Sequence, residues 1–99
     1  AGCASLGLAP ASTFEEKLAY AASQNASVRT ATANALDAGD IALADAQSVL
    51  KLTDESRALL DAARVAAGAG DLSTAEARLG LATTILVKLQ AYLRERNKA

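Results

Sequence analysis

Few residues of this 99-residue chain could carry chemistry. The chain holds one thiol, Cys3, and no His, so it can assemble neither a His-activated nucleophile nor a Cys/His metal cluster. Carboxylates such as Asp54 and Asp61 alternate with basic residues at i+3 and i+4 spacing, which is typical of ion pairs on an exposed helix. We therefore predict that the protein is not an enzyme and has no cofactor and no metal site.

The residues around Cys3 favour a different reaction, which is lipidation of its thiol. The run Ala1-Gly2-Cys3-Ala4-Ser5 resembles the end of a bacterial lipobox, in which two small residues precede the lipidated Cys. No Asp follows Cys3, and by resemblance to the lipoprotein sorting rule this predicts an outer-membrane lipoprotein facing the periplasm. Several acyl chains give a stable anchor where one does not. The alternative is a free thiol in a tail.

The composition of residues 1–12 differs from that of the segment after them, in which the first helix is predicted. Residues 1–12 are small and uncharged and contain Gly and Pro, so they are predicted to be an N-terminal linker. Two overlapping capping boxes are predicted, one formed by Ser12 with Glu15 and the other by Thr13 with Glu16. In a capping box the side chain of each residue accepts a hydrogen bond from the backbone N–H of the other. The first helix is therefore predicted to begin near residue 13.

One short segment occurs twice and divides the rest of the chain. The segment Ala38–Ala46 returns in similar form as Ala69–Ala77. Gly39 and Gly70 can take the left-handed conformation that ends a helix, and Ser73 opens a Ser-x-x-Glu capping box that starts the next one. The predicted helices therefore span about residues 13–38, 42–67 and 73–95.

Inward-facing positions recur at alternating spacings of three and four residues, as in helices packed on helices. The first stripe is Phe14, Leu18, Ala21, Asn25, Val28, Thr32 and Ala35. The second is Ala46, Val49, Leu50, Thr53, Leu60, Ala63 and Ala67. The third is Leu72, Ala75, Leu79, Ala82, Leu86, Leu89 and Leu93.

Short turns between long helices force consecutive helices to lie antiparallel. Residues 13–99 are thus predicted to form one all-α domain, an antiparallel up-down-up three-helix bundle behind a short N-terminal linker. Gly80 lies inside the third helix, where it costs roughly 1 kcal/mol relative to Ala. A close contact with another helix would explain its presence.

Two polar residues, Asn25 and Thr32, fall on the inward stripe of the first helix. One interpretation is a polar pocket inside the bundle, so a small-molecule binding module remains an alternative function. The favoured interpretation is structural, with a buried Asn that sets the register and a Thr bonded to its own helix. Ala-rich interiors pack tightly, so a sizeable internal cavity is not expected.

The middle of the first helix has few charges. Between Lys17 and Asp37 only Arg29 is charged, and the outward residues are Ala, Ser, Thr, Gln and Asn. A solvated helix face usually carries more Glu and Lys. The face is interpreted either as a seam that binds a second copy or another protein, or as a neutral hydrated surface. Its candidate contact residues are Tyr20, Gln24 and Ser27.

The charge balance excludes one class of partner and limits another. Ten basic and eleven acidic residues give a net charge of −1, whereas binding to nucleic-acid phosphates needs a basic excess. The only basic cluster, Arg94, Arg96 and Lys98, suits the negative end of a helix. No run of eighteen apolar residues exists, so contact with a membrane is predicted only through a lipid on Cys3.

Several segments together resemble a known family. They are Phe14–Tyr20, Val28–Ala31, Ala38–Ile41, Asp45–Ala46, Leu60–Arg64 and Leu89–Leu93. In these the chain is similar to small proteobacterial predicted lipoproteins, some of them prophage-borne, a family without an established activity. Ala42 departs from the family, where relatives tend to carry a Ser cap. The resemblance implies an envelope location, and its prophage members raise a phage-related envelope function in superinfection exclusion or lysis as a further alternative.

The leading hypothesis from the sequence combines the anchor with the uncharged helix face. It is a lipid-anchored helical protein of the periplasm that acts by binding another envelope protein or itself. The thiol of Cys3 carries the anchor in this hypothesis, and the first helix carries the binding surface.

Overall fold

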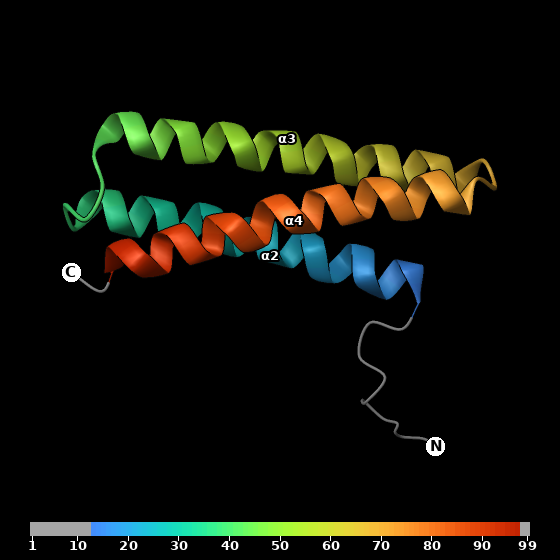
Figure 1. The fold of residues 1–99 in the computed structure, drawn as a ribbon, viewed down its shortest axis with the longest axis horizontal. Helices are drawn as coiled ribbons and strands as arrows, with labels where there is room; N and C mark the ends of the chain where they lie inside the picture. Colours follow the sequence, from blue (N-terminus) through green and yellow to red (C-terminus); the bar gives the residue numbers. More distant parts are fainter. Residues whose placement is uncertain (1–12, 98–99) are drawn as a thin grey trace, which may run out of the picture.

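The computed structural model describes residues 13–97, which form three α-helices and no strand. These are α2 (Phe14–Asp37), α3 (Leu43–Gly68) and α4 (Leu72–Asn97). Each helix contacts both of the others, and consecutive helices run in opposite directions, so that α2 and α4 run the same way (Figure 1). The predicted all-α up-down-up three-helix bundle is confirmed.

The start of α2 is the capping box predicted from Thr13 and Glu16. The backbone N–H of Glu16 donates to Oγ1 of Thr13 at 3.1 Å, and the backbone N–H of Thr13 donates to Oε1 of Glu16 at 3.3 Å. Two backbone donors that the helix itself leaves unpaired are thereby satisfied. The second predicted box includes Ser12, which lies outside the described residues.

Both turns end the preceding helix in the same way. Gly39 has a φ of +79°, and its N–H donates to the carbonyl of Leu36 at 3.1 Å. The N–H of Asp40 donates to the carbonyl of Ala35 at 2.8 Å. These two bonds form a Schellman motif, which requires a left-handed residue and so favours glycine. Gly70, with a φ of +82°, closes α3 through the equivalent pair of bonds.

The restart after the second turn differs from the prediction. The backbone N–H of Thr74 donates to Oδ1 of Asp71 at 3.1 Å, so the capping side chain is Asp71 rather than Ser73. The helix begins at Leu72, directly after that residue. The predicted Ser73 capping box is therefore wrong. The carboxylate of Asp71, directly after Gly70, already accepts a hydrogen bond from a backbone N–H in the first turn of the helix. The helix can therefore start at the next residue, without a second capping residue at position 73.

The two copies of the repeated segment consequently differ in burial: the apolar residue is buried in the first copy and exposed in the second. Ile41 precedes the cap residue Ala42, which makes no side-chain capping bond, and Ile41 is buried in the core at 6% exposed. Its counterpart Leu72 is already the first residue of α4 and is 54% exposed. The prediction that Leu72 packs inward is wrong, because the earlier helix start turns its side chain away from the bundle.

The core lies along the shared axis of the three helices and is built from few large side chains. Several of its fully buried positions hold Ala, which lets helix axes approach closely. The buried apolar residues are Leu18, Ala21, Val28, Ala35, Ile41, Ala46, Val49, Leu60, Ala63, Ala75, Leu79, Ala82, Leu86, Leu89 and Leu93.

Most of the predicted stripes are buried, with exceptions near their ends and in α3. Phe14, Leu50 and Ala67 are only half-buried. Ser56 is fully buried although the apolar pattern did not single it out, and its Oγ donates to the carbonyl of Ala82 on α4 at 3.4 Å. A small hydroxyl-bearing residue thus serves as a core residue where α3 and α4 are close.

Candidate functional site

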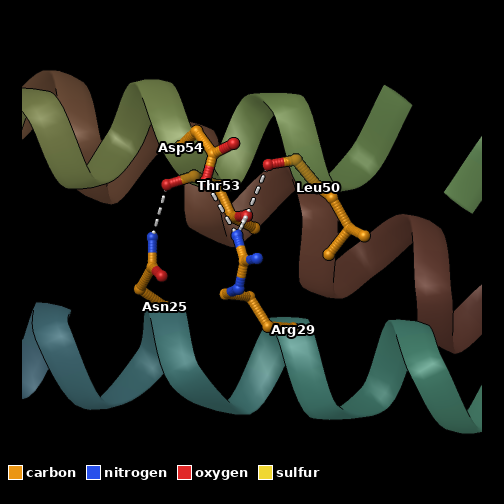
Figure 2. Close-up of polar contacts among 5 residues, drawn as sticks. All are labelled: Asn25, Arg29, Leu50, Thr53 and Asp54. Carbon is orange, nitrogen blue, oxygen red and sulfur yellow. Dashed lines mark hydrogen bonds and ion pairs between the residues drawn. The ribbon is translucent and has the colours of Figure 1, made fainter. Parts of the chain in front are cut away.

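A group of polar side chains joins α2 to α3 (Figure 2). Nδ2 of Asn25 donates to the backbone carbonyl of Thr53 at 2.8 Å, and both residues are buried. A buried amide that loses its partner costs about 1–3 kcal/mol, so this bond favours one sliding position of α2 along α3 over its neighbours. Asn25 therefore sets the register of these two helices.

The hydroxyl of Thr53 continues the same group towards the surface. Its Oγ1 donates to the carbonyl of Leu50 at 2.7 Å and accepts from Nη1 of Arg29 at 2.7 Å. The same Nη1 lies 2.9 Å from Oδ1 of Asp54 (Figure 2). The one charge in the middle of α2 is thus directed at α3 and paired there, which leaves the remaining surface of α2 without charge over this stretch.

Thr32, the other inward polar residue of α2, is satisfied within its own helix. Its Oγ1 donates to the carbonyl of Val28 at 2.7 Å. Asn25 and Thr32 thus have the structural roles favoured by the sequence, and neither lines the cavity described next. These polar residues hold the fold together rather than forming a pocket inside it.

A groove of about 540 Å³ runs between α2 and α4, near the C-terminal ends of both helices. Its buried side chains are Val28, Ala35 and Leu93, which give it an apolar floor. The residues around this floor are mainly small or polar. They are Ser27, Ala31, Asn34, Ala38, Asp40, Gln90 and Arg94. We call this surface the α2–α4 groove. It lies on the surface of the bundle, between α2 and α4.

Of the three predicted contact residues, only Ser27 lines this groove. Gln24 lies three residues before Ser27, and Tyr20 lies four residues before Gln24, so both share a face of α2 with Ser27. Tyr20 is 62% exposed. Gln24 is half-buried, and its Oε1 has no hydrogen-bond partner within residues 13–97. One helix face therefore brings the three residues together.

The α4 side of the groove follows the same helical spacing. Gln90 and Arg94 line the groove. Steps of three or four residues back from Gln90 lead along the same face of α4 to Val87, Thr83, Gly80 and Glu76. Nζ of Lys17 lies 3.7 Å from Oε1 of Glu76, which shows that this face of α4 meets α2. The groove surface thus extends from the Lys17–Glu76 pair to Arg94.

Charges occur only at the two ends of this surface. Lys17 on α2 and Glu76 on α4 mark one end, whereas Asp40 after α2 and Arg94 on α4 mark the other. Asp40 and Arg94 form no ion pair within residues 13–97. Each end thus carries one acid and one base on opposite sides, and the intervening positions are uncharged.

Metal-ligating and titratable side chains give one further finding each. No three His, Cys, Asp or Glu side chains within residues 13–97 gather closely enough to hold a metal ion. Within residues 13–97 one pKa is clearly shifted, that of the capping residue Asp71, which the Thr74 hydroxyl and then its backbone N–H hold below its ordinary value of 3.8. This shift reflects stabilisation of a capping carboxylate and has no connection with the groove.

The remaining surface charges form simple pairs. Nη1 of Arg64 lies 3.0 Å from Oδ1 of Asp61, an i,i+3 pair of the kind predicted. Asp54, by contrast, pairs across helices, which its sequence neighbours did not indicate. Arg96 lies over the ring of Tyr92 at 5.4 Å from the centroid.

Of the helices described, none combines the length and apolarity that crossing a bilayer requires.

Comparisons of the chain with protein-family models, with curated proteins and with solved structures give no match. Cys3, the predicted lipidation site, lies outside the described residues. The function is therefore inferred from the residues and the geometry of the chain itself.

Proposed function

We propose that this protein is a non-enzymatic binding module of the bacterial envelope, which binds a protein partner in the α2–α4 groove. The observation that carries the proposal is that the groove surface is uncharged between its two ends, because the only charge in the middle of α2, that of Arg29, is paired with Asp54 of α3. Burying a charge in an interface is costly unless it is paired, so a face without charges loses little when it is covered.

The proposal includes a lipid anchor on Cys3, supported by the small residues before it and the absence of Asp after it. Residue 13 lies at the end of the bundle where α2 begins, whereas the groove lies towards the end where α2 and α4 finish (Figure 1). The 24 residues of α2 separate these ends by about 36 Å at 1.5 Å per residue. The chain from Cys3 would thus reach the bundle at the end remote from the groove.

A site-specific crosslink tests the binding surface. A photo-reactive amino acid is placed at Ser27, which lines the groove, and in a matched variant at Ser48, which is exposed on α3 away from it. Irradiation of intact cells should give a discrete adduct from position 27 and not from position 48. Equal adducts from both positions, or none from position 27, would contradict binding in the groove.

The anchor is tested independently of the groove. Cells grown with a labelled fatty acid should yield a labelled protein, and the Cys3→Ser variant should carry no label. The labelled protein should also separate with outer-membrane fractions. Equal labelling of both proteins would remove the anchor from the proposal and leave the binding surface unaffected, because the groove residues are distant in sequence from Cys3.

The volume of the groove favours a second candidate, a small apolar ligand. Pockets for such ligands span about 300–1,000 Å³, and the groove has about 540 Å³. Chemical shifts of Val28 and Leu93, recorded by NMR during titration with octanoate and octylamine, separate the candidates. Saturable shifts at these two residues would support the ligand, and unchanged shifts would exclude such amphiphiles.

A further inference from the structure

The groove surface that extends from the Lys17–Glu76 pair to Arg94 has an acid and a base at each end, and their positions on α2 and α4 are exchanged between the two ends. At one end the base is on the α2 side and the acid is on α4, as Lys17 and Glu76. At the other end the acid is on the α2 side and the base is on α4, as Asp40 and Arg94. A surface with this pattern is complementary to itself, because a two-fold rotation brings a base opposite an acid at both ends.

We propose that the partner in the groove is a second copy of this chain, so that two grooves face each other in a two-fold dimer. The inference rests on the function proposed above and names the occupant of the same surface. Ser27 and Ala31 lie in the uncharged middle of the groove surface. When this part of one copy is covered by the same part of a second copy, no charge has to be desolvated.

Gly80 supports the close approach of another helix. It lies inside α4, and nothing in the described chain lies within 4 Å of where a Cβ would stand. The intrachain helix contact that its presence suggested is therefore not found. A glycine on an open helix face costs roughly 1 kcal/mol without compensation from within the bundle. Its lack of a side chain does allow the backbone of a neighbouring molecule to come near, as small residues do at helix interfaces.

The size of the groove surface sets the expected strength of the dimer. From Glu76 to Arg94 on α4 it is about 27 Å long, and two helix widths make it about 20 Å wide, so each copy offers on the order of 500 Å². Standard interfaces bury about 800 Å² per partner, so this dimer belongs to the weak class. Its dissociation constant is expected to be on the order of micromolar or weaker. Two-dimensional confinement on a membrane would favour such an association.

Two arrangements satisfy the charge pattern. If the copies run parallel, α2 faces α4 of the partner, and Arg94 meets the partner's Asp40. If they run antiparallel, α4 faces α4, and Arg94 meets the partner's Glu76. In both arrangements Arg94 faces an acid, so Arg94→Glu should weaken the dimer in either case.

Sedimentation equilibrium of the purified protein, up to about 1 mM, tests the proposal. The wild type should dimerise, Ser27→Glu should weaken the dimer at least tenfold, and Ser48→Glu should leave it unchanged. Gly80→Ala should raise the melting temperature and also weaken the dimer, which a merely structural glycine would not do. Circular dichroism checks that each variant is folded.

Double variants then distinguish the arrangements. Arg94→Glu with Asp40→Arg should restore a parallel dimer, and Arg94→Glu with Glu76→Arg an antiparallel one. A monomer at every concentration, or equal effects of Ser27→Glu and Ser48→Glu, would overturn the self-association. If the crosslink at position 27 then gives only an adduct with a different protein, the proposed binding function stands and the second copy is wrong.

Discussion

Arg29 of α2 and Asp54 of α3 form an ion pair across the helix interface, with 2.9 Å between Nη1 and Oδ1. The same Nη1 lies 2.7 Å from Oγ1 of Thr53, which is fully buried. The ion pair is largely exposed to solvent, whereas the hydroxyl is not. The two contacts of one guanidinium should therefore differ in what they contribute to stability.

A double-mutant cycle with Arg29→Met and Asp54→Asn should give a coupling free energy of about 0.2–1 kcal/mol, because solvent screens the pair. Thr53→Val should lower the free energy of unfolding by about 1 kcal/mol or more, since it also removes the bond to the Leu50 carbonyl. Urea unfolding measures both. A coupling far above the cost of Thr53→Val would mean that the ion pair dominates the interface.

The two turn glycines should be intolerant of a side chain for conformational reasons alone. A Cβ at Gly39 or Gly70 would meet nothing within 4 Å, yet both have positive φ. Gly39→Ala and Gly70→Ala should each destabilise by about 1–2 kcal/mol. Gly68→Ala is the matched control, because Gly68 is helical and equally open, and it should stabilise by up to about 1 kcal/mol. Thermal unfolding that ranked all three alike would refute the left-handed turns.

The cap at Asp71 should make stability depend on acid pH. Its pKa is lowered in the folded protein by the Thr74 hydroxyl and backbone N–H, so its contribution is fully present above its unfolded pKa of about 3.9. That contribution is lost as the pH falls through the lower, folded pKa. Asp71→Asn keeps a capping oxygen but does not titrate, so the difference from wild type in free energy of unfolding should shrink below about pH 4.

Thr74→Val separates the two causes of the Asp71 shift. It removes the hydroxyl and keeps the backbone N–H, which lies 3.1 Å from the Asp71 carboxylate. The acid-dependent loss of stability should therefore be smaller than in wild type but still measurable by urea unfolding at several pH values. If Thr74→Val and wild type behaved identically, the hydroxyl would have no part in the cap.

Two leucines of α4 should respond very differently to truncation. Leu86 is 0% exposed and Leu81 is 53% exposed, only one and a half turns away on the same helix. Leu86→Ala should cost about 2–5 kcal/mol, since it removes buried surface and leaves a cavity in a core with few large side chains. Leu81→Ala should change stability by less than about 0.5 kcal/mol in urea unfolding. Similar losses for both would place the core on the wrong face of α4.

The sequence predicted the bundle because two local signals agree, the spacing of the buried residues and the position of the turn glycines. The spacing of three and four placed even the polar Asn25 and Thr32 on the buried face, where the structure has them. Gly39 and Gly70 predicted both turns, because a helix that ends with a residue in the left-handed conformation usually has glycine at that position. These signals depend on chain geometry over a few residues, which a single sequence displays directly.

What the sequence did not predict depends on competition between neighbours or on the rotation of whole helices. Asp71 and Ser73 are both good caps, and only the geometry of the turn decides that Asp71 is used. Arg29 and Asp54 are far apart in sequence, so their pairing follows from how α2 and α3 are rotated against each other. The α2–α4 groove likewise appears only once two helices are placed, although the lack of charge on α2 indicated the helix concerned.

Because α2 and α4 run the same way, the start of α2 and the end of α4 lie at opposite ends of the bundle (Figure 1). The 26 residues of α4 hold these ends about 39 Å apart. Tension applied between them would act along the helix axes and slide the helices past one another in shear. All three helix interfaces would then bear the load together, because each helix contacts both of the others.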